Sequence, residues 1–165
     1  HVKDNKIVFQ FDFLGHLDKI GLNASLYCPG LDRESWYKKW VTDYLEEVAS
    51  RNLLVEVNTK AWETRGRFYP NYDYFELMND LGIRVVVNSD AHYPEKINAG
   101  RIEALYALAQ AGYTNVWQFC KGNWVDVPIE IKFRSFPFCN NVIVSFLVTA
   151  FFDLRALFDP FSVPP

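Results

Sequence analysis

The sequence predicts an α/β fold in which strands and helices alternate and the strands form a parallel sheet. Apolar runs of strand length alternate with segments whose apolar residues recur at helical spacing. The run IRVVVNS at 83–89 is apolar almost throughout, which is typical of a strand buried on both faces of a parallel sheet. The polar side chains of greatest chemical interest follow these runs, at the strand ends where α/β proteins build their sites.

The predicted elements are bounded by turn and helix-end signals. In chain order they are a strand at 7–14, a helix at 35–50, a strand at 53–59, a helix at 72–81, a strand at 83–89, a helix at 99–112 and a strand pair within 115–128. Gly82 and Gly112 end two of these helices, because glycine readily adopts the left-handed conformation that closes a helix. Lys121-Gly122-Asn123 predicts the turn of the last strand pair.

The helix at 35–50 carries the most distinctive apolar pattern. Trp36, Trp40 and Tyr44 recur every four residues, and Leu45 and Val48 continue at helical spacing. We expect the aromatic stripe to lie in the core rather than to stack on a ligand.

Composition excludes several classes of protein. Half of the 165 residues are hydrophobic and 17% are aromatic, which argues against a disordered chain. A net charge of -3 disfavours a nucleic-acid groove, which usually carries a basic surplus. The chain contains no GxGxxG or GxxxxGK[ST] phosphate loop and no GxSxG nucleophile elbow.

Cysteine usage and the apolar segments indicate a cytoplasmic protein. Cys28, Cys120 and Cys139 are odd in number and lack CxxC spacing, which fits a reduced compartment. The opening HVKDNK is polar and does not resemble a signal peptide. The apolar run at 142–152 is too short to span a bilayer, which needs about 20 apolar residues, so we expect no membrane partner.

We expect one domain over residues 1–130, followed by an atypical apolar tail at 131–165. The tail is dense in Phe and Val but has no clean period. An extra core helix, a partner-facing segment and a product of misread or fused sequence are all compatible with it. The chain lacks an initiating Met and opens almost directly on a strand, so we interpret its start as a cut end.

Two couplets of histidine and aspartate follow apolar runs. His16 and Asp18 lie in GHLD, and Asp90 and His92 lie in NSDAH. Residues i and i+2 of a strand point the same way, so each couplet could present both side chains together. Imidazole and carboxylate together suit Zn, Mn or Fe. The alternative is that each aspartate caps the next turn while the histidine makes a local hydrogen bond.

A second group of polar residues surrounds the strand LLVEVNT at 53–59. Glu56 and Asn58 lie on the face opposite its valines and could orient a ligand or hold the following loop, or they could form an ordinary polar face. The loop carries Lys60, Arg65 and Arg67. Arginine offers bidentate hydrogen bonds to a phosphate and lysine a point charge, although a loop with three cations is often simply solvated.

GHLDKI, LLVEVNTKA and VVVNSDAH, in this order and at these intervals, resemble the second half of the PHP family of metal-dependent phosphoesterases. Within that family the resemblance is closest to the histidinol-phosphate phosphatases, and it runs from about Phe11 to Pro128. It implies a distorted βα barrel of the TIM type, of which this chain would hold about three C-terminal βα units.

The resemblance also implies a role for each candidate residue. His16 is similar to the metal-binding histidine of the GHxD element. Asp90 and His92 are similar to the metal ligands of the SDAH element, and we take both as catalytic. Arg65 is our first choice for the arginine that binds the substrate phosphate, followed by Arg67 and Lys60. We expect three further residues to hold the metal ligands in position without binding the metal themselves: Asp18, Glu56 and Asn58.

The chain departs from the family pattern in one respect. The family opens with an HxH element, further histidines and a glutamate, which complete a cluster of two or three divalent metal ions. Here the one remaining histidine is His1, which is not part of an HxH element. We therefore expect a fragment with three of the ligands, inactive by itself. Its cut sheet edge or its apolar tail would favour self-association.

The resemblance implies hydrolysis of L-histidinol phosphate to L-histidinol and phosphate in histidine biosynthesis. Metal-activated water would attack phosphorus while cations hold the phosphate oxygens. One alternative is a PHP phosphoesterase for another small phosphate ester or a nucleic-acid end. The other is a non-catalytic remnant that binds a partner. If the chain belongs to a histidinol phosphatase, we expect a small phosphorylated substrate and no nucleic-acid partner.

Overall fold

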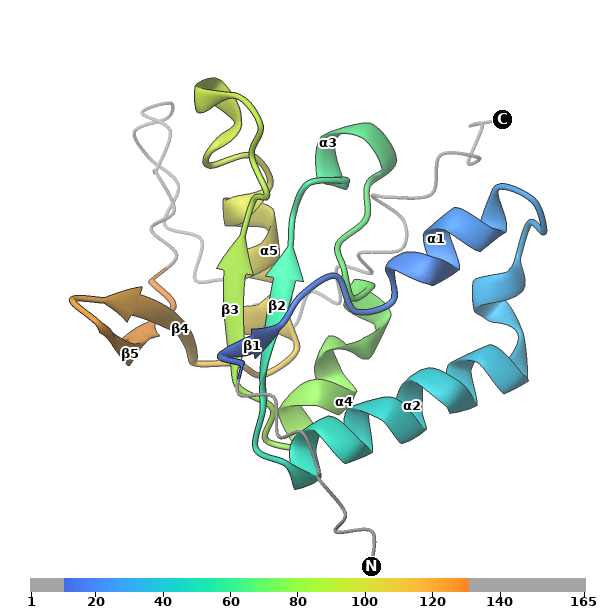
Figure 1. The fold of residues 1–165 in the computed structure, drawn as a ribbon, viewed down its shortest axis with the longest axis horizontal. Helices are drawn as coiled ribbons and strands as arrows, with labels where there is room; N and C mark the ends of the chain where they lie inside the picture. Colours follow the sequence, from blue (N-terminus) through green and yellow to red (C-terminus); the bar gives the residue numbers. More distant parts are fainter. Residues whose placement is uncertain (1–10, 131–165) are drawn as a thin grey trace, which may run out of the picture. The chain divides into compact units, whose positions relative to one another are not determined.

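The computed structural model describes residues 11–130, which form a mixed α/β unit around a curled five-stranded sheet (Figure 1). The strands are β1 (Phe13–Leu14), β2 (Leu54–Asn58), β3 (Val85–Asn88), β4 (Asn115–Cys120) and β5 (Asn123–Pro128). They lie side by side in chain order. The first four are parallel, and β5 returns antiparallel to β4 as a hairpin. The predicted α/β class and the parallel pairing are confirmed.

Helices connect the parallel strands. They are α1 (Lys19–Ser25), α2 (Ser35–Ser50), α3 (Trp62–Arg65), α4 (Phe75–Asp80) and α5 (Arg101–Gln110), with short 3-10 helices η1 (Leu31–Arg33), η2 (Tyr72–Tyr74) and η3 (Pro94–Lys96). Because each connection returns the chain to the start of the next parallel strand, the carboxyl ends of β1, β2 and β3 lie at one edge of the sheet. Within residues 11–130, no helix is both long and apolar enough to cross a membrane.

The two faces of β2 have different chemistry. Val55 and Val57 are fully buried and belong to the hydrophobic core, together with Leu45 of α2 and Met78 of α4. The alternate side chains, Glu56 and Asn58, are polar and are also buried. A buried polar side chain is costly unless it is hydrogen-bonded, so this second face must carry its own polar network.

The prediction that the aromatic stripe of α2 lies in the core is wrong. Trp36, Trp40 and Tyr44 are 58%, 52% and 41% exposed. The buried face of α2 is formed by Tyr37, Val41, Leu45 and Val48. Both sets have helical spacing. Periodicity identifies a face, but it cannot say which of two adjacent apolar faces the sheet will cover.

Most predicted boundaries agree with the structure within two residues. The helix expected at 72–81 is instead a turn of 3-10 helix, η2, followed by α4. Of the strand expected at 7–14, residues 11–14 are described, and only Phe13–Leu14 is strand; residues 7–10 lie outside the described part of the chain. The expected apolar tail at 131–165 also lies outside the described residues.

Candidate functional site

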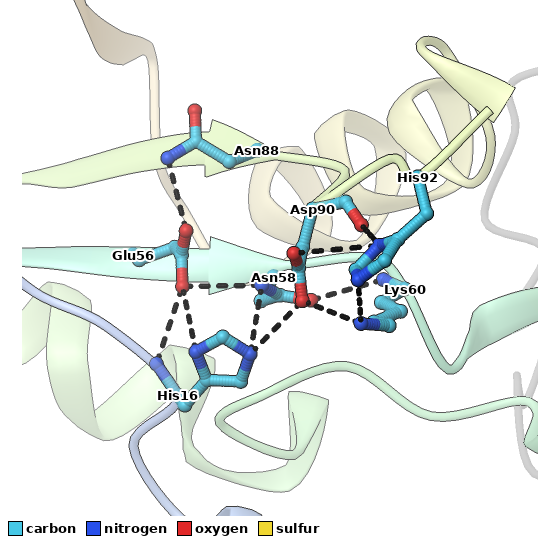
Figure 2. A network of polar contacts seen from close by, with 7 residues as sticks. All are labelled: His16, Glu56, Asn58, Lys60, Asn88, Asp90 and His92. Carbon is cyan, nitrogen blue, oxygen red and sulfur yellow. Dashed lines mark hydrogen bonds and ion pairs between the residues drawn. The ribbon is translucent and has the colours of Figure 1, made fainter. Parts of the chain in front are cut away.

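Three strand ends bring seven polar side chains together (Figure 2). His16 follows β1, Lys60 follows β2, and Asp90 follows β3. The set comprises His16, Glu56, Asn58, Lys60, Asn88, Asp90 and His92. Residues more than seventy positions apart in the chain therefore meet, as His16 and Asp90 do. The juxtaposition follows from the parallel pairing, since carboxyl ends of neighbouring parallel strands lie at the same edge.

His16 and Asp90 are in direct contact. His16 Nε2 lies 3.2 Å from Asp90 Oδ2 and 3.5 Å from the side-chain nitrogen of Asn58. Both residues have left-handed backbone conformations, with φ of 54° at His16 and 46° at Asp90. Non-glycine residues adopt this region at a cost and are concentrated at functional sites. The two sharp bends turn these side chains toward one another just beyond the strands.

Glu56 organises the buried side of the group. One of its carboxylate oxygens accepts hydrogen bonds from the His16 backbone N–H and from the Asn58 amide, both at 3.2 Å. The other oxygen accepts from the Asn88 amide at 3.0 Å. Gly15 lets the chain pass close to Glu56, because a Cβ atom there would lie 3.1 Å from the Glu56 carboxylate. Glu56 thus fixes the backbone that carries His16.

Lys60 places a positive charge among these groups. Its ammonium donates to Asp90 Oδ2 at 3.0 Å and lies 3.4 Å from His92 Nε2. The Lys60 backbone N–H donates to Asn58 Oδ1 at 3.0 Å, which anchors the start of the loop. The hydrogen bond from Lys60 is the main cause that lowers the pKa of Asp90, and His16 contributes in the same direction. Asp90 is therefore ionised at neutral pH.

The partners of His92 define its tautomer. Its Nδ1 lies 2.9 Å from the Asp90 carbonyl oxygen, which can only accept a hydrogen bond, so Nδ1 carries the proton. Nε2 is then left with a lone pair, which receives the Lys60 ammonium. A histidine held in this way presents a ligating nitrogen on its exposed side.

Asp18 and Arg67 form a separate, buried network. Arg67 donates to Asp18 at 2.8 Å and to Asp32 at 2.6 Å, and Tyr37 donates its hydroxyl proton to Asp18 at 2.5 Å. The Asn71 backbone N–H also donates to Asp18, at 3.3 Å. This network joins the segment after β1 to the loop after β2 and to η1.

The structure therefore separates residues that the sequence grouped together. His16 and Asp18 do not project together, because β1 ends at Leu14 and the alternation of a strand no longer applies at Asp18, whose φ is 66°. Arg67 contacts Asp18 and Asp32 rather than the seven-residue group, and Arg65 is exposed at the end of α3. Asp90 and His92 remain together.

Sequence reasoning missed Asn88 as a member of the group. It lies two residues before Asp90, and the register pairs it directly with Asn58 on the neighbouring strand. The polar ending of an otherwise apolar strand was the available signal. Tyr37 and Asp32 of the buried network had no comparable signal, since their roles depend on contacts across 19 and 35 residues.

The donor chemistry of the site suits a divalent metal ion. Two ligand atoms about 2.1 Å from a tetrahedral metal lie about 3.4 Å apart, close to the 3.2 Å between His16 Nε2 and Asp90 Oδ2. No group of three or more His, Cys, Asp or Glu side chains within residues 11–130 is arranged to hold a metal as it stands. The Lys60 ammonium contacts Asp90 Oδ2 and His92 Nε2, one carboxylate oxygen and one imidazole nitrogen of this group.

The chain was also compared with known proteins. No protein-family model matches the sequence, and no curated protein matches it significantly.

Proposed function

We propose that this chain takes part in metal-dependent hydrolysis of a phosphate monoester, as the C-terminal part of a PHP-type phosphoesterase. The observation that carries the proposal is the meeting of His16, Asp90, His92 and Lys60 at the carboxyl ends of parallel strands. The first three match the ligands that the GHxD and SDAH elements imply. Lys60 is the cation nearest to them, and a phosphate site needs such a cation.

The arrangement of the sheet supports the same proposal. Parallel strands that neighbour one another in chain order and are joined by helices, as β1 to β4 are, form the repeating unit of a βα barrel. We propose that the curled sheet is part of a distorted barrel of the TIM type. In such barrels the reacting groups lie at the carboxyl ends of the strands, where the seven-residue group lies.

His16, Asp90 and His92 would hold a Zn, Mn or Fe ion, and in the PHP family two or three such ions activate the attacking water. The chain's own residues have defined tasks beside it. Glu56 holds the His16 backbone, and the Asp90 carbonyl oxygen holds the protonated Nδ1 of His92. With these contacts in place, His16 Nε2 faces Asp90 and His92 Nε2 faces the Lys60 ammonium.

Two cations of the loop after β2 are available for a phosphate. Lys60 lies in the site, and Arg65 makes no ion pair within the described residues. Arg67 is engaged by Asp18 and Asp32, so its contribution would require breaking a buried network. Lys60 and Arg65 are therefore our choices for the phosphate ligands.

The substrate that best fits the resemblance is L-histidinol phosphate. The experiment is metal binding by the purified 165-residue chain, measured by calorimetry with Zn²⁺ and Mn²⁺, for the wild type and for His16→Ala. We expect binding that His16→Ala weakens at least tenfold. Absence of metal binding by the wild type, or binding unaffected by His16→Ala, would contradict the proposal.

A phosphatase panel then identifies the substrate class. Histidinol phosphate, other small phosphate esters and an oligonucleotide with a terminal phosphate are compared at equal concentration. We expect little turnover by the chain alone, with histidinol phosphate as the preferred ester. Preference for the oligonucleotide end would reject the histidinol phosphate assignment but retain the phosphoesterase class. Metal binding without turnover of any ester would favour a non-catalytic remnant.

A further inference from the structure

The position of Lys60 has a consequence for the binding of a metal ion. Its ammonium lies 3.0 Å from Asp90 Oδ2 and 3.4 Å from His92 Nε2. The Nε2 atom of His92 presents a lone pair to it, because Nδ1 carries the proton. The lysine ammonium thus contacts one carboxylate oxygen and one imidazole nitrogen. Zn and Mn ions coordinate the same types of donor atom.

A divalent ion and this ammonium cannot occupy the same place. A metal bound to Asp90 Oδ2 and His92 Nε2 would lie about 2.1 Å from each atom. Lys60 Nζ lies within 3.4 Å of both atoms, so it would be at most about 5 Å from the metal. It also faces the single lone pair of His92 Nε2, which a bound metal would need. Their repulsion at such a distance is strong even in a solvated site. Metal binding therefore requires the ammonium to leave.

The lysine has the freedom to leave. Its side chain is exposed, while its backbone N–H is fixed to the Asn58 side chain, so the ammonium can swing on a four-carbon stem without moving the loop. A phosphate bound beside the metal would offer new acceptor oxygens to the displaced ammonium. Within residues 11–130, no other lysine or arginine contacts Asp90 or His92.

We propose that Lys60 is a built-in competitor for the metal site, which holds Asp90 and His92 until a divalent ion displaces it and then serves as a phosphate ligand. The inference rests on the proposed function, since it requires a metal and a phosphate at this site. It implies that metal affinity is weakened by the chain's own cation. It also implies that Lys60 weakens the binding of the metal and strengthens the binding of the phosphate.

The test uses the full 165-residue chain and three variants. Lys60→Met removes the charge but keeps the length of the side chain, and Lys60→Arg keeps the charge. Lys96→Met is the matched control, because Lys96 pairs with Glu63 on the surface and lies outside the seven-residue group. Calorimetry with Zn²⁺ or Mn²⁺ alone measures the first effect. Titration of inorganic phosphate into the metal-loaded proteins measures the second.

We expect Lys60→Met to bind the metal about threefold to tenfold more tightly than the wild type, because the metal no longer has to break a partly exposed ion pair. It should bind inorganic phosphate about threefold to tenfold more weakly. Lys60→Arg should bind the metal more weakly than Lys60→Met, because its charge still competes, and Lys96→Met should bind the metal like the wild type. A residue that competes with the metal and holds the phosphate should move the two affinities in opposite directions, and Lys96→Met controls for the loss of a surface charge.

The contrary outcomes separate this inference from the proposed function. Equal metal affinity in the wild type and Lys60→Met would overturn the competition and leave the metal site standing. Tighter metal binding with unchanged phosphate affinity would overturn the second role of Lys60. Absence of metal binding in both proteins would contradict the proposed function itself, and the inference with it.

Discussion

Asp18 and Asp90 begin from nearly the same local sequence and end in opposite surroundings. Each lies two residues from a histidine, each follows a strand, and each has a left-handed backbone. The Asp18 side chain is 0% exposed and is held by Arg67, whereas the Asp90 side chain is 29% exposed and is held by Lys60. One carboxylate is enclosed by permanent partners, and the other faces solvent with a partner that can move.

The comparison shows that burial determines what a carboxylate can do. A buried ion pair is costly to break, because removing one partner leaves an uncompensated charge away from water. A partly exposed pair contributes little to stability, because water replaces the lost partner. We therefore expect Asp18 to hold the loops together, and under the proposed function Asp90 is the carboxylate that binds the metal. Four predictions test this division, in order of decreasing effect on stability.

Asp18→Asn should be the most destabilising change. Asparagine tolerates the left-handed backbone, so the loss reports the charge rather than strain. We expect the free energy of unfolding to fall by about 3 kcal/mol, since Arg67 would lose its fully buried partner and keep only the partly exposed Asp32. Urea unfolding of both proteins measures it. A change below about 1 kcal/mol would show that Asp32 alone satisfies Arg67.

The matched control for that variant is Asp43→Asn. Asp43 pairs with Lys39 one helical turn earlier on α2, and both side chains are exposed. Such exposed pairs contribute little to stability, because water and salt screen them. A loss comparable to that of Asp18→Asn would contradict the role of burial in the comparison.

Tyr37→Phe should have the second-largest effect. The substitution removes the hydroxyl that donates to Asp18 and leaves the aromatic ring on the buried face of α2. A hydrogen bond to a charged group contributes about 2 kcal/mol, so we expect a loss of about that size. Thermal and urea unfolding measure it. Metal affinity should be unchanged, and a parallel loss of metal binding would show that the buried network also positions His16.

Asp90→Asn should separate stability from function. Asparagine again suits the positive φ of 46°, and the lost ion pair is partly exposed, so the free energy of unfolding should change by less than about 1 kcal/mol. Metal affinity, measured by calorimetry, should fall at least tenfold because a neutral amide replaces an anionic ligand. A stable variant that still binds the metal normally would remove Asp90 from the proposed ligands.

The smallest effect concerns the titration of Asp90. Lys60 lowers the pKa of its carboxyl below the ordinary value of about 3.9. The stabilisation from this contact is therefore present above about pH 4 and is lost as the pH falls through the lowered pKa. In Lys60→Met the pKa should rise toward the ordinary value, as followed by NMR of the side-chain carboxyl. An unchanged pKa would show that Lys60 does not hold Asp90 in solution.

Several features could be predicted from the sequence because they depend on local patterns. The apolar run at 83–89 contains the buried β3, and Lys121-Gly122-Asn123 turns the chain between β4 and β5. Parallel pairing follows from alternating strands and helices, and it places the carboxyl ends together. The meeting of His16 with Asp90 was predictable for that reason.

Other features depend on which surfaces meet, and the tertiary structure alone decided them. The sequence offers two apolar faces on α2, and packing against the sheet buried the face of Tyr37 while leaving Trp40 exposed. It also offers three cations in one loop, of which Arg67 pairs with the buried Asp18 and Lys60 reaches Asp90. The physical reason is that burial and charge pairing are properties of neighbours distant in the chain. GHLD and NSDAH contain the same pair of residue types. Their surroundings place Asp18 in a buried ion pair with Arg67 and Asp90 in a partly exposed ion pair with Lys60.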